Sequence, residues 1–193
     1  MTAQTGATIQ TAVVKHRVSE LRAASPDIQI DWRHRPCAGI FRRIAIADIE
    51  ADFARFRVNL ILLGHHLAVQ AEGLVLCAEL NTKRLVVGSS VYQADEYVEQ
   101  SPEALDFFRA FCARHHVVLE TPVRDYATLD DVKFALLDFG VTTKSLEAVS
   151  LFADSFSPAT AQTVREYLAA KAPIADAYVT LRTRRFTPRR PGS

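Results

Sequence analysis

The residues best suited to chemistry follow a short apolar run, Leu85-Val86-Val87. The turn Gly88-Ser89-Ser90 comes directly after it, at what would be the carboxyl end of a parallel strand, where α/β proteins bind ligands. Two hydroxyls and free main-chain N–H groups can hold a phosphate or the edge of a purine. The following residues offer stacking and hydrogen bonds to a heterocycle, or form a solvated loop: Tyr92, Gln93, Asp95 and Glu96. A plain turn that leads into a helix is the alternative interpretation of Gly88-Ser89-Ser90.

Arginines gather at two places in the chain. The first group, Arg33, Arg35, Arg42 and Arg43, is the best candidate for an anion-binding site, because the planar guanidinium matches the geometry of phosphate. A solvated basic face remains the alternative. The second group, within residues 182–190, lies among Thr, Pro, Gly and Ser, and is predicted to be a disordered basic tail. Contact with nucleic acid is expected at that tail if anywhere.

Histidines and cysteines do not form a recognisable metal motif. The pairs His65-His66 and His115-His116 lack metal-ligand spacing to a nearby carboxylate, and the three cysteines, Cys37, Cys77 and Cys112, include no CxxC. We therefore predict no metal, no zinc and no disulfide framework. No Ser-His-Asp set or paired-carboxylate motif occurs, so the sequence identifies no catalytic residue.

The composition is that of an ordinary globular protein. The 193 residues are 49% hydrophobic and carry a net charge of +1, which gives no general attraction to nucleic acid or to an anionic membrane. Residues 1–10 lack a basic segment leading into an apolar one, so no signal peptide is predicted. The longest apolar run, residues 58–80, is interrupted by His, Gln and Glu and is predicted not to span a membrane. A cytoplasmic location is the simplest expectation.

Hydrophobic periodicity predicts the elements that position these residues. In the first half of the chain we expect a helix over 13–24, strands over 27–32 and 40–46, a short helix or turn over 48–56, and a helix from 59 to about 80. In the second half we expect strands over 84–88 and 117–120, and helices over 102–114, 129–139 and 157–170, the last ending before Pro173. Ser101 and Thr128 are the expected helix caps, and Gly140 the expected C-terminal glycine.

Alternation of strands and helices predicts an α/β protein with a parallel sheet and crossover helices. The expected organisation is a single domain over 13–180, between a flexible N-terminus at 1–12 and the basic tail at 181–193.

Several short segments, taken in order, resemble one enzyme family. They are Asn59 before an apolar helix with Arg57 one residue displaced, Val86-Val87-Gly88, Tyr97 and Glu99 with Pro102-Glu103, Glu120-Thr121-Pro122 with Asp125, Leu129 to Val141, and Thr143-x-Ser145. In this order and spacing, residues 57–145 resemble the 7-cyano-7-deazaguanine synthases, which are PP-loop ATP pyrophosphatases of queuosine and 7-deazapurine biosynthesis.

The resemblance implies a fold, a ligand class and a set of binding residues. The fold would be a Rossmann-like three-layer sandwich of the adenine nucleotide alpha hydrolase type, and the activity an ATP-dependent ligation. The substrate-binding residues that it implies, together with those of the turn described above, are Asn59, Gly88, Ser89, Ser90, Tyr92, Tyr97, Glu99, Thr121 and Asp125.

Other parts of the chain depart from the family pattern. The Ser-Gly-Gly-x-Asp-Ser loop that cradles pyrophosphate does not occur, although ATP remains a possible ligand. Leu146 stands where the first zinc cysteine is expected, and no cysteine follows it. Thr128 or Leu129 replaces the expected lysine. An enzyme that lacks its phosphate loop loses the groups that stabilise developing charge.

The sequence therefore predicts a degenerate relative, a pseudoenzyme that binds a nucleotide or 7-deazapurine without ATP turnover on its own. Two alternatives remain. The chain is an active C–N ligase completed by a partner subunit that supplies the phosphate loop, or it is a non-catalytic interaction subunit. The apolar 58–80 stretch could form a homodimer interface or be buried within one chain.

Overall fold

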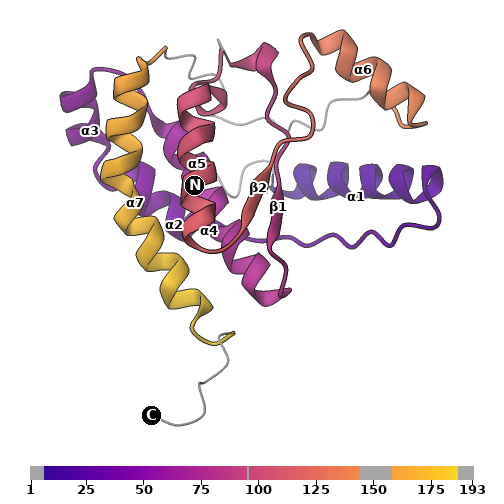
Figure 1. The fold of residues 1–193 in the computed structure, drawn as a ribbon, viewed down its shortest axis with the longest axis horizontal. Helices are drawn as coiled ribbons and strands as arrows, with labels where there is room; N and C mark the ends of the chain where they lie inside the picture. Colours follow the sequence, from indigo (N-terminus) through magenta and orange to yellow (C-terminus); the bar gives the residue numbers. More distant parts are fainter. Residues whose placement is uncertain (1–6, 95, 144–157, 187–193) are drawn as a thin grey trace. The chain divides into compact units, whose positions relative to one another are not determined.

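The computed structural model of the protein describes residues 7–94, 96–143 and 158–186. These residues form two compact units. Unit 1 lies within residues 1–36 and 126–154, and unit 2 within residues 37–125 and 155–193. Figure 1 shows both units in one ribbon.

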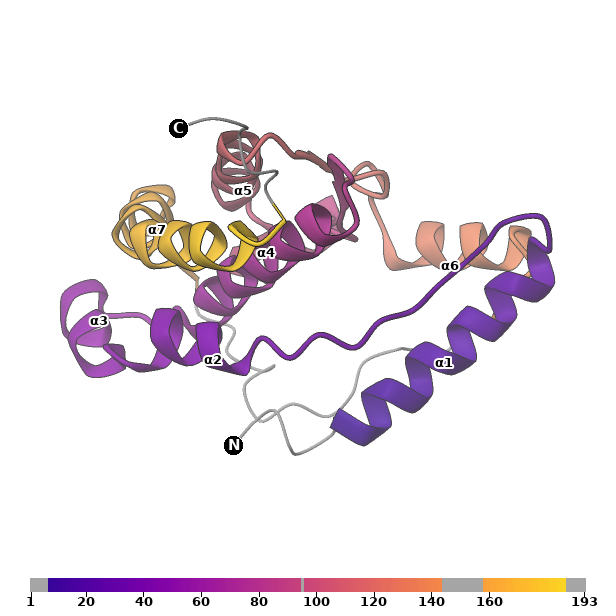
Figure 2. The same ribbon diagram turned by 90° about the horizontal axis from the view of Figure 1, so that it is seen from below.

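Unit 2 is a helical assembly around one parallel strand pair. Its helices are α2 (Ala38–Phe41), the π-helix η1 (Arg42–Ile46), α3 (Ile49–Phe56), α4 (Ile61–Glu79), α5 (Pro102–Arg114) and α7 (Ala161–Thr183), with 3₁₀ turns η2 (Val91–Gln93) and η3 (Val98–Gln100). Figures 1 and 2 show α7 beside α4 and α5, and these three helices supply most of the core.

Helix α4 is the centre of unit 2. Eleven of its 19 residues are buried, on more than one face, because α7, η1 and β1 all contact it. By length and composition α4 is apolar enough to cross a bilayer, but 61% of that stretch is buried inside the structure. The helix begins at Ile61, where the Asn59 side chain accepts a hydrogen bond from the Ile61 N–H at 3.0 Å.

The sheet has two described strands, β1 (Arg84–Val86) and β2 (Val118–Glu120), which pair in parallel. Leu85 lies opposite Leu119. Leu119 is buried, and both leucines pack into the core, whereas Val86 and Val118 are more than half exposed. The predicted class, α/β with parallel strands, is confirmed at this level.

The helix predicted over 102–114 is confirmed with the same bounds as α5. Ser101 caps it, because its hydroxyl accepts from the Ala104 N–H at 3.3 Å, and Pro102 occupies the first turn. Its buried stripe includes Phe108 and Phe111, which are at most 1% exposed. Strong local signals, namely a cap, a proline and a regular apolar stripe, are therefore sufficient to place this helix.

Two predicted strands are wrong. Residues 40–46 are helical, because Ile40, Phe41, Ile44 and Ala45 are all buried and follow the spacing of a helix rather than of a strand. The alternation at Ile44 and Ile46 suggested a strand only because it covered so few residues. The segment 27–32 forms no strand, and Ile28 is 58% exposed.

The last helix also differs from its prediction. Helix α7 begins at Ala161, is capped by Thr160, and continues to Thr183 with Pro173 inside it. Buried residues recur on both sides of the proline, at Tyr167 and Leu168 and again at Ala175 and Val179. Packing of this continuous stripe against α4 and α5 outweighs the hydrogen bond that the proline removes.

Unit 1 contains α1 (Ala7–Ala24) and α6 (Leu129–Asp138). Helix α1 begins at Ala7 rather than at Val13 as predicted. Arg17 of α1 donates to the main-chain oxygen of Thr142 at 2.7 Å. The predicted cap of α6 is confirmed, since Thr128 and Asp131 form a reciprocal capping box, and Gly140 beyond the helix has a φ of +81°.

Candidate functional site

The parallel register brings together the two chain segments that leave the sheet. Residues 87–91 follow β1, and residues 121–124 follow β2. The Val91 N–H donates to the main-chain oxygen of Arg124 at 3.0 Å, and the Arg124 guanidinium donates to the main-chain oxygen of Ser90 at 3.2 Å. Two segments predicted from separate motifs thus form one place, which we call the strand-end site, at the carboxyl end of both strands.

Side chains within the strand-end site bond mainly to one another. Gln93 Oε1 accepts from the Ser90 hydroxyl at 3.1 Å and from Gln100 Nε2 at 3.0 Å, while Gln100 Oε1 accepts from the Ser90 N–H at 3.0 Å. The Arg124 guanidinium also donates to the main-chain oxygen of Gln100 at 2.9 Å. These bonds hold the turn in one conformation, so Ser90 serves first as a structural group.

The other predicted residues of this region differ in availability. Ser89 is buried, Tyr92 and Tyr97 are half-buried, and Asp125 is exposed. The Thr121 hydroxyl accepts from Arg109 at 2.9 Å. A Cβ placed on Gly88 would meet no atom within 4 Å, so the main chain at Gly88 is open to close approach.

Glu99 is the most unusual acid of unit 2. It is 4% exposed, and within the described residues its Oε2 has no hydrogen-bond partner. Its Oε1 lies 3.7 Å from His66 Nε2 of α4. Burial raises the pKa of Glu99 and lowers that of His66, because it disfavours the charged form of each. The two groups lie within ion-pair distance, and burial disfavours the charged form of each.

Asn59 lies elsewhere, in a pocket that contains no other predicted substrate-binding residue. The pocket has a volume of about 400 Å³ and lies between α3, the start of α4, η1 and α7. We call it the α3–α4 pocket. Its lining residues are Ala45, Ile49, Glu50, Asp52, Phe53, Val58, Asn59, Leu60, Ile61 and Tyr167.

A buried ion-pair cluster lies beside this pocket. Lys171 of α7, with a side chain only 5% exposed, has its Nζ 3.0 Å from Asp48 Oδ2 and 2.8 Å from Asp52 Oδ2. Both contacts are ion pairs of the Lys171 ammonium with a carboxylate. Burial lowers the pKa of Lys171, but pairing with the two carboxylates more than offsets burial and raises it.

The four arginines of the predicted anion site do not lie in one unit. Arg33 and Arg35 belong to unit 1, where each has a polar or electrostatic interaction. Arg42 and Arg43 are exposed residues of η1 in unit 2. The predicted anion site thus draws two of its arginines from unit 1 and two from unit 2. The end of the basic tail, residues 187–193, lies outside the described residues.

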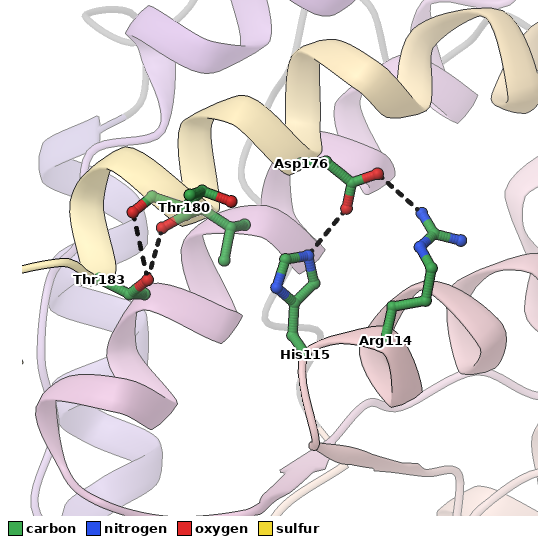
Figure 3. Close-up of polar contacts among 6 residues, drawn as sticks. Arg114, His115, Asp176, Thr180 and Thr183 are labelled. Carbon is green, nitrogen blue, oxygen red and sulfur yellow. Dashed lines mark hydrogen bonds and ion pairs between the residues drawn. The ribbon is translucent and has the colours of Figure 1, made fainter. Parts of the chain in front are cut away.

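Asp176 of α7 joins the end of α5 through two contacts (Figure 3). His115 Nε2 lies 2.8 Å from Asp176 Oδ1, and Arg114 donates to Asp176 Oδ2 at 3.0 Å. Two turns further along α7, the Thr183 hydroxyl donates to the Val179 main-chain oxygen at 2.9 Å. Neither contact brings a nucleophilic side chain to His115, so the two contacts fasten α5 to α7 and do not form a catalytic set.

Sequence reasoning missed the residues that organise the strand-end site and the ion-pair cluster beside the α3–α4 pocket. Gln100 and Arg124 belong to no motif, and their role depends on the pairing of β1 with β2. Lys171 lies on the buried stripe of α7, four residues after Tyr167. A charged residue on an apolar stripe signals a buried partner, so this position could have been recognised.

Comparisons of the chain with protein-family models, with curated proteins and with solved structures found no match. Within the described residues, no group of three or more His, Cys, Asp or Glu side chains is placed to hold a metal ion. The position of the expected zinc cysteines, from Leu146 onward, falls in the stretch 144–157 that the structure does not describe.

Proposed function

We propose that this chain is a cytoplasmic, non-catalytic relative of the 7-cyano-7-deazaguanine synthases that binds a 7-deazapurine or a nucleotide at the strand-end site. The observation that carries the proposal is that hydrogen bonds of Arg124 join the two segments that follow β1 and β2, residues 87–91 and 121–124. The resemblance implies that both of these segments contact the same ligand.

The chemistry of the strand-end site suits a flat heterocycle. The open main chain at Gly88 allows a ring to approach, and the half-buried Tyr92 and Tyr97 offer faces for stacking. A purine-type ring with N–H donors on one edge would complement the unpartnered Oε2 of Glu99. Because Glu99 is almost fully buried, such a contact requires the covering side chains to move and would change the surroundings of His66.

The proposal extends to the finer architecture. Strands β1 and β2 would correspond to two neighbouring strands of the three-layer Rossmann-like sandwich. Their parallel pairing, with α5 connecting them, supports this correspondence. The missing Ser-Gly-Gly-x-Asp-Ser loop supports binding without ATP turnover.

Calorimetric titration of the full chain with 7-deazaguanine, AMP and ATP tests the binding. We expect heat with at least one of them, and weaker binding in Glu99→Gln, which replaces an acceptor by an amide. Asp106→Asn is the matched control, because Asp106 is an exposed acid of α5 that belongs to neither candidate site. Absence of heat with all three compounds refutes the proposed binding. Stoichiometric release of AMP or ADP from ATP by the purified chain refutes the non-catalytic part.

A further inference from the structure

The α3–α4 pocket has the size and lining of a small-molecule site. Its volume of about 400 Å³ falls within the usual range for ligand pockets. Aliphatic and aromatic side chains form most of its wall, including Val58, Leu60 and Ile61. Phe53 and Ile49, which are 53% and 37% exposed, bring further apolar surface to it. The body of a fitting ligand is therefore apolar.

One polar group of the pocket has no hydrogen-bond partner in the described part of the chain. Tyr167 is 1% exposed and lines the pocket, and within the described residues its hydroxyl makes no hydrogen bond. Its ring is held by an edge contact with Phe56. The hydroxyl fits only because residue 64 is glycine, since a Cβ there would lie 2.5 Å from it. A ligand atom in the pocket could form a hydrogen bond with this hydroxyl.

The charged groups of the lining are both acidic. Glu50 and Asp52 contribute carboxylates, and Lys171 is shared between Asp52 and Asp48, so one positive charge faces three negative ones. No basic side chain is among the lining residues. Anionic ligands, including nucleotides, are therefore disfavoured here, and a single positive charge is favoured.

We propose that the α3–α4 pocket binds a small apolar amine, with its hydrocarbon or aromatic body against the apolar wall and its ammonium group between the acidic side chains and the Tyr167 hydroxyl. The ammonium would donate to that hydroxyl and to a carboxylate. This site and its ligand class are independent of the strand-end site, so either proposal can fail without the other.

Three probes with one common body test the charge preference: 3-phenylpropylamine, 3-phenyl-1-propanol and 3-phenylpropanoate. Binding to the full chain is followed by NMR chemical-shift changes of the residues that line the pocket. We expect the amine to bind more tightly than the alcohol, and about tenfold or more tightly than the carboxylate. Equal affinities, tightest binding of the carboxylate, or no binding of the amine at millimolar concentration would overturn the proposal.

Two variants test the residues. Tyr167→Phe keeps the ring and is expected to weaken amine binding about three- to tenfold. Glu50→Gln, at an exposed position, is expected to weaken amine binding about two- to fivefold and to leave the alcohol unchanged. Asp106→Asn, an exposed acid on α5 outside the pocket, is the matched control and should change neither. Amine affinities that are the same in Glu50→Gln and Asp106→Asn would refute the acidic contact.

Discussion

Replacing Lys171 by methionine should destabilise unit 2 through its carboxylate partners. Removing one member of a buried ion pair costs about 3–5 kcal/mol, because the other charge is left buried. Here the two partners differ: Asp48 is 58% exposed and can regain water, whereas Asp52 is 19% exposed and cannot do so fully. Only one carboxylate, that of Asp52, is left buried without its partner. The expected loss of unfolding free energy is therefore near the lower limit, at about 3 kcal/mol.

Neighbouring variants make this reasoning specific. Asp48→Asn should cost no more than about 1 kcal/mol, because its pairing is mostly exposed to water. The double variant Lys171→Met with Asp52→Asn should recover most of the loss, since no charge is then left buried without its partner. The contribution of Lys171 is present at pH 7, because its raised pKa means that it is lost only when the pH rises beyond 10.5.

Urea unfolding at pH 7, followed by far-UV circular dichroism, measures these free energies. The reasoning is refuted if Lys171→Met loses less than 1 kcal/mol, or if the double variant is no more stable than the single one. Equal losses in Asp48→Asn and Lys171→Met would show that exposure does not control the energetics of this cluster.

Three further outcomes follow from other contacts. Glu99→Gln should raise the unfolding free energy by about 1 kcal/mol at pH 7. Because burial raises the pKa of Glu99, the wild type loses stability as the pH rises above 4.5. The gain from the substitution should therefore vanish when urea unfolding is measured at lower pH. Gly64→Ala should cost about 1–2 kcal/mol in thermal unfolding, because the added Cβ would lie 2.5 Å from the Tyr167 hydroxyl and 2.8 Å from the Ala45 Cβ. Adding Tyr167→Phe should recover only the part of this loss that comes from the hydroxyl, and no recovery would contradict that contribution. Arg124→Met should lower the unfolding free energy by about 2 kcal/mol and speed amide hydrogen exchange at Ser90. Unchanged exchange would show that the segments following β1 and β2 stay together without Arg124.

Local signals in the sequence placed the elements that have distinct ends. Helix α5 has Ser101 and Pro102 at its start, and α6 has the Thr128 capping box and Gly140, so both were predicted closely. Strands β1 and β2 were recognised as short apolar runs between turn residues. Because these strands pair in parallel, the segments that follow them leave the sheet at the same edge.

Long-range packing decided the positions that sequence reasoning missed. The residues before α3 form a helix because Ile44 and Ala45 pack against α4, a neighbour that no local pattern reveals. Similarly, α7 continues through Pro173 because its buried stripe is anchored on both sides. The α3–α4 pocket depends on contacts between Tyr167 and residues more than 100 positions earlier, so only Asn59 was identified in advance.

The π-helix η1 has a consequence for how this part of the chain tolerates change in length. Its Ala47 N–H donates to the Arg42 oxygen at 2.8 Å, five residues back instead of four. Such a turn contains one residue more than an α-helical turn. Deleting a single residue within 42–46 would convert this wide turn into an ordinary α-helical one, so the residues that follow would keep nearly the same orientation relative to α2. The same deletion inside the regular helix α4 would instead rotate everything beyond it by about 100°. One-residue deletions should therefore be tolerated better in η1 than in α4.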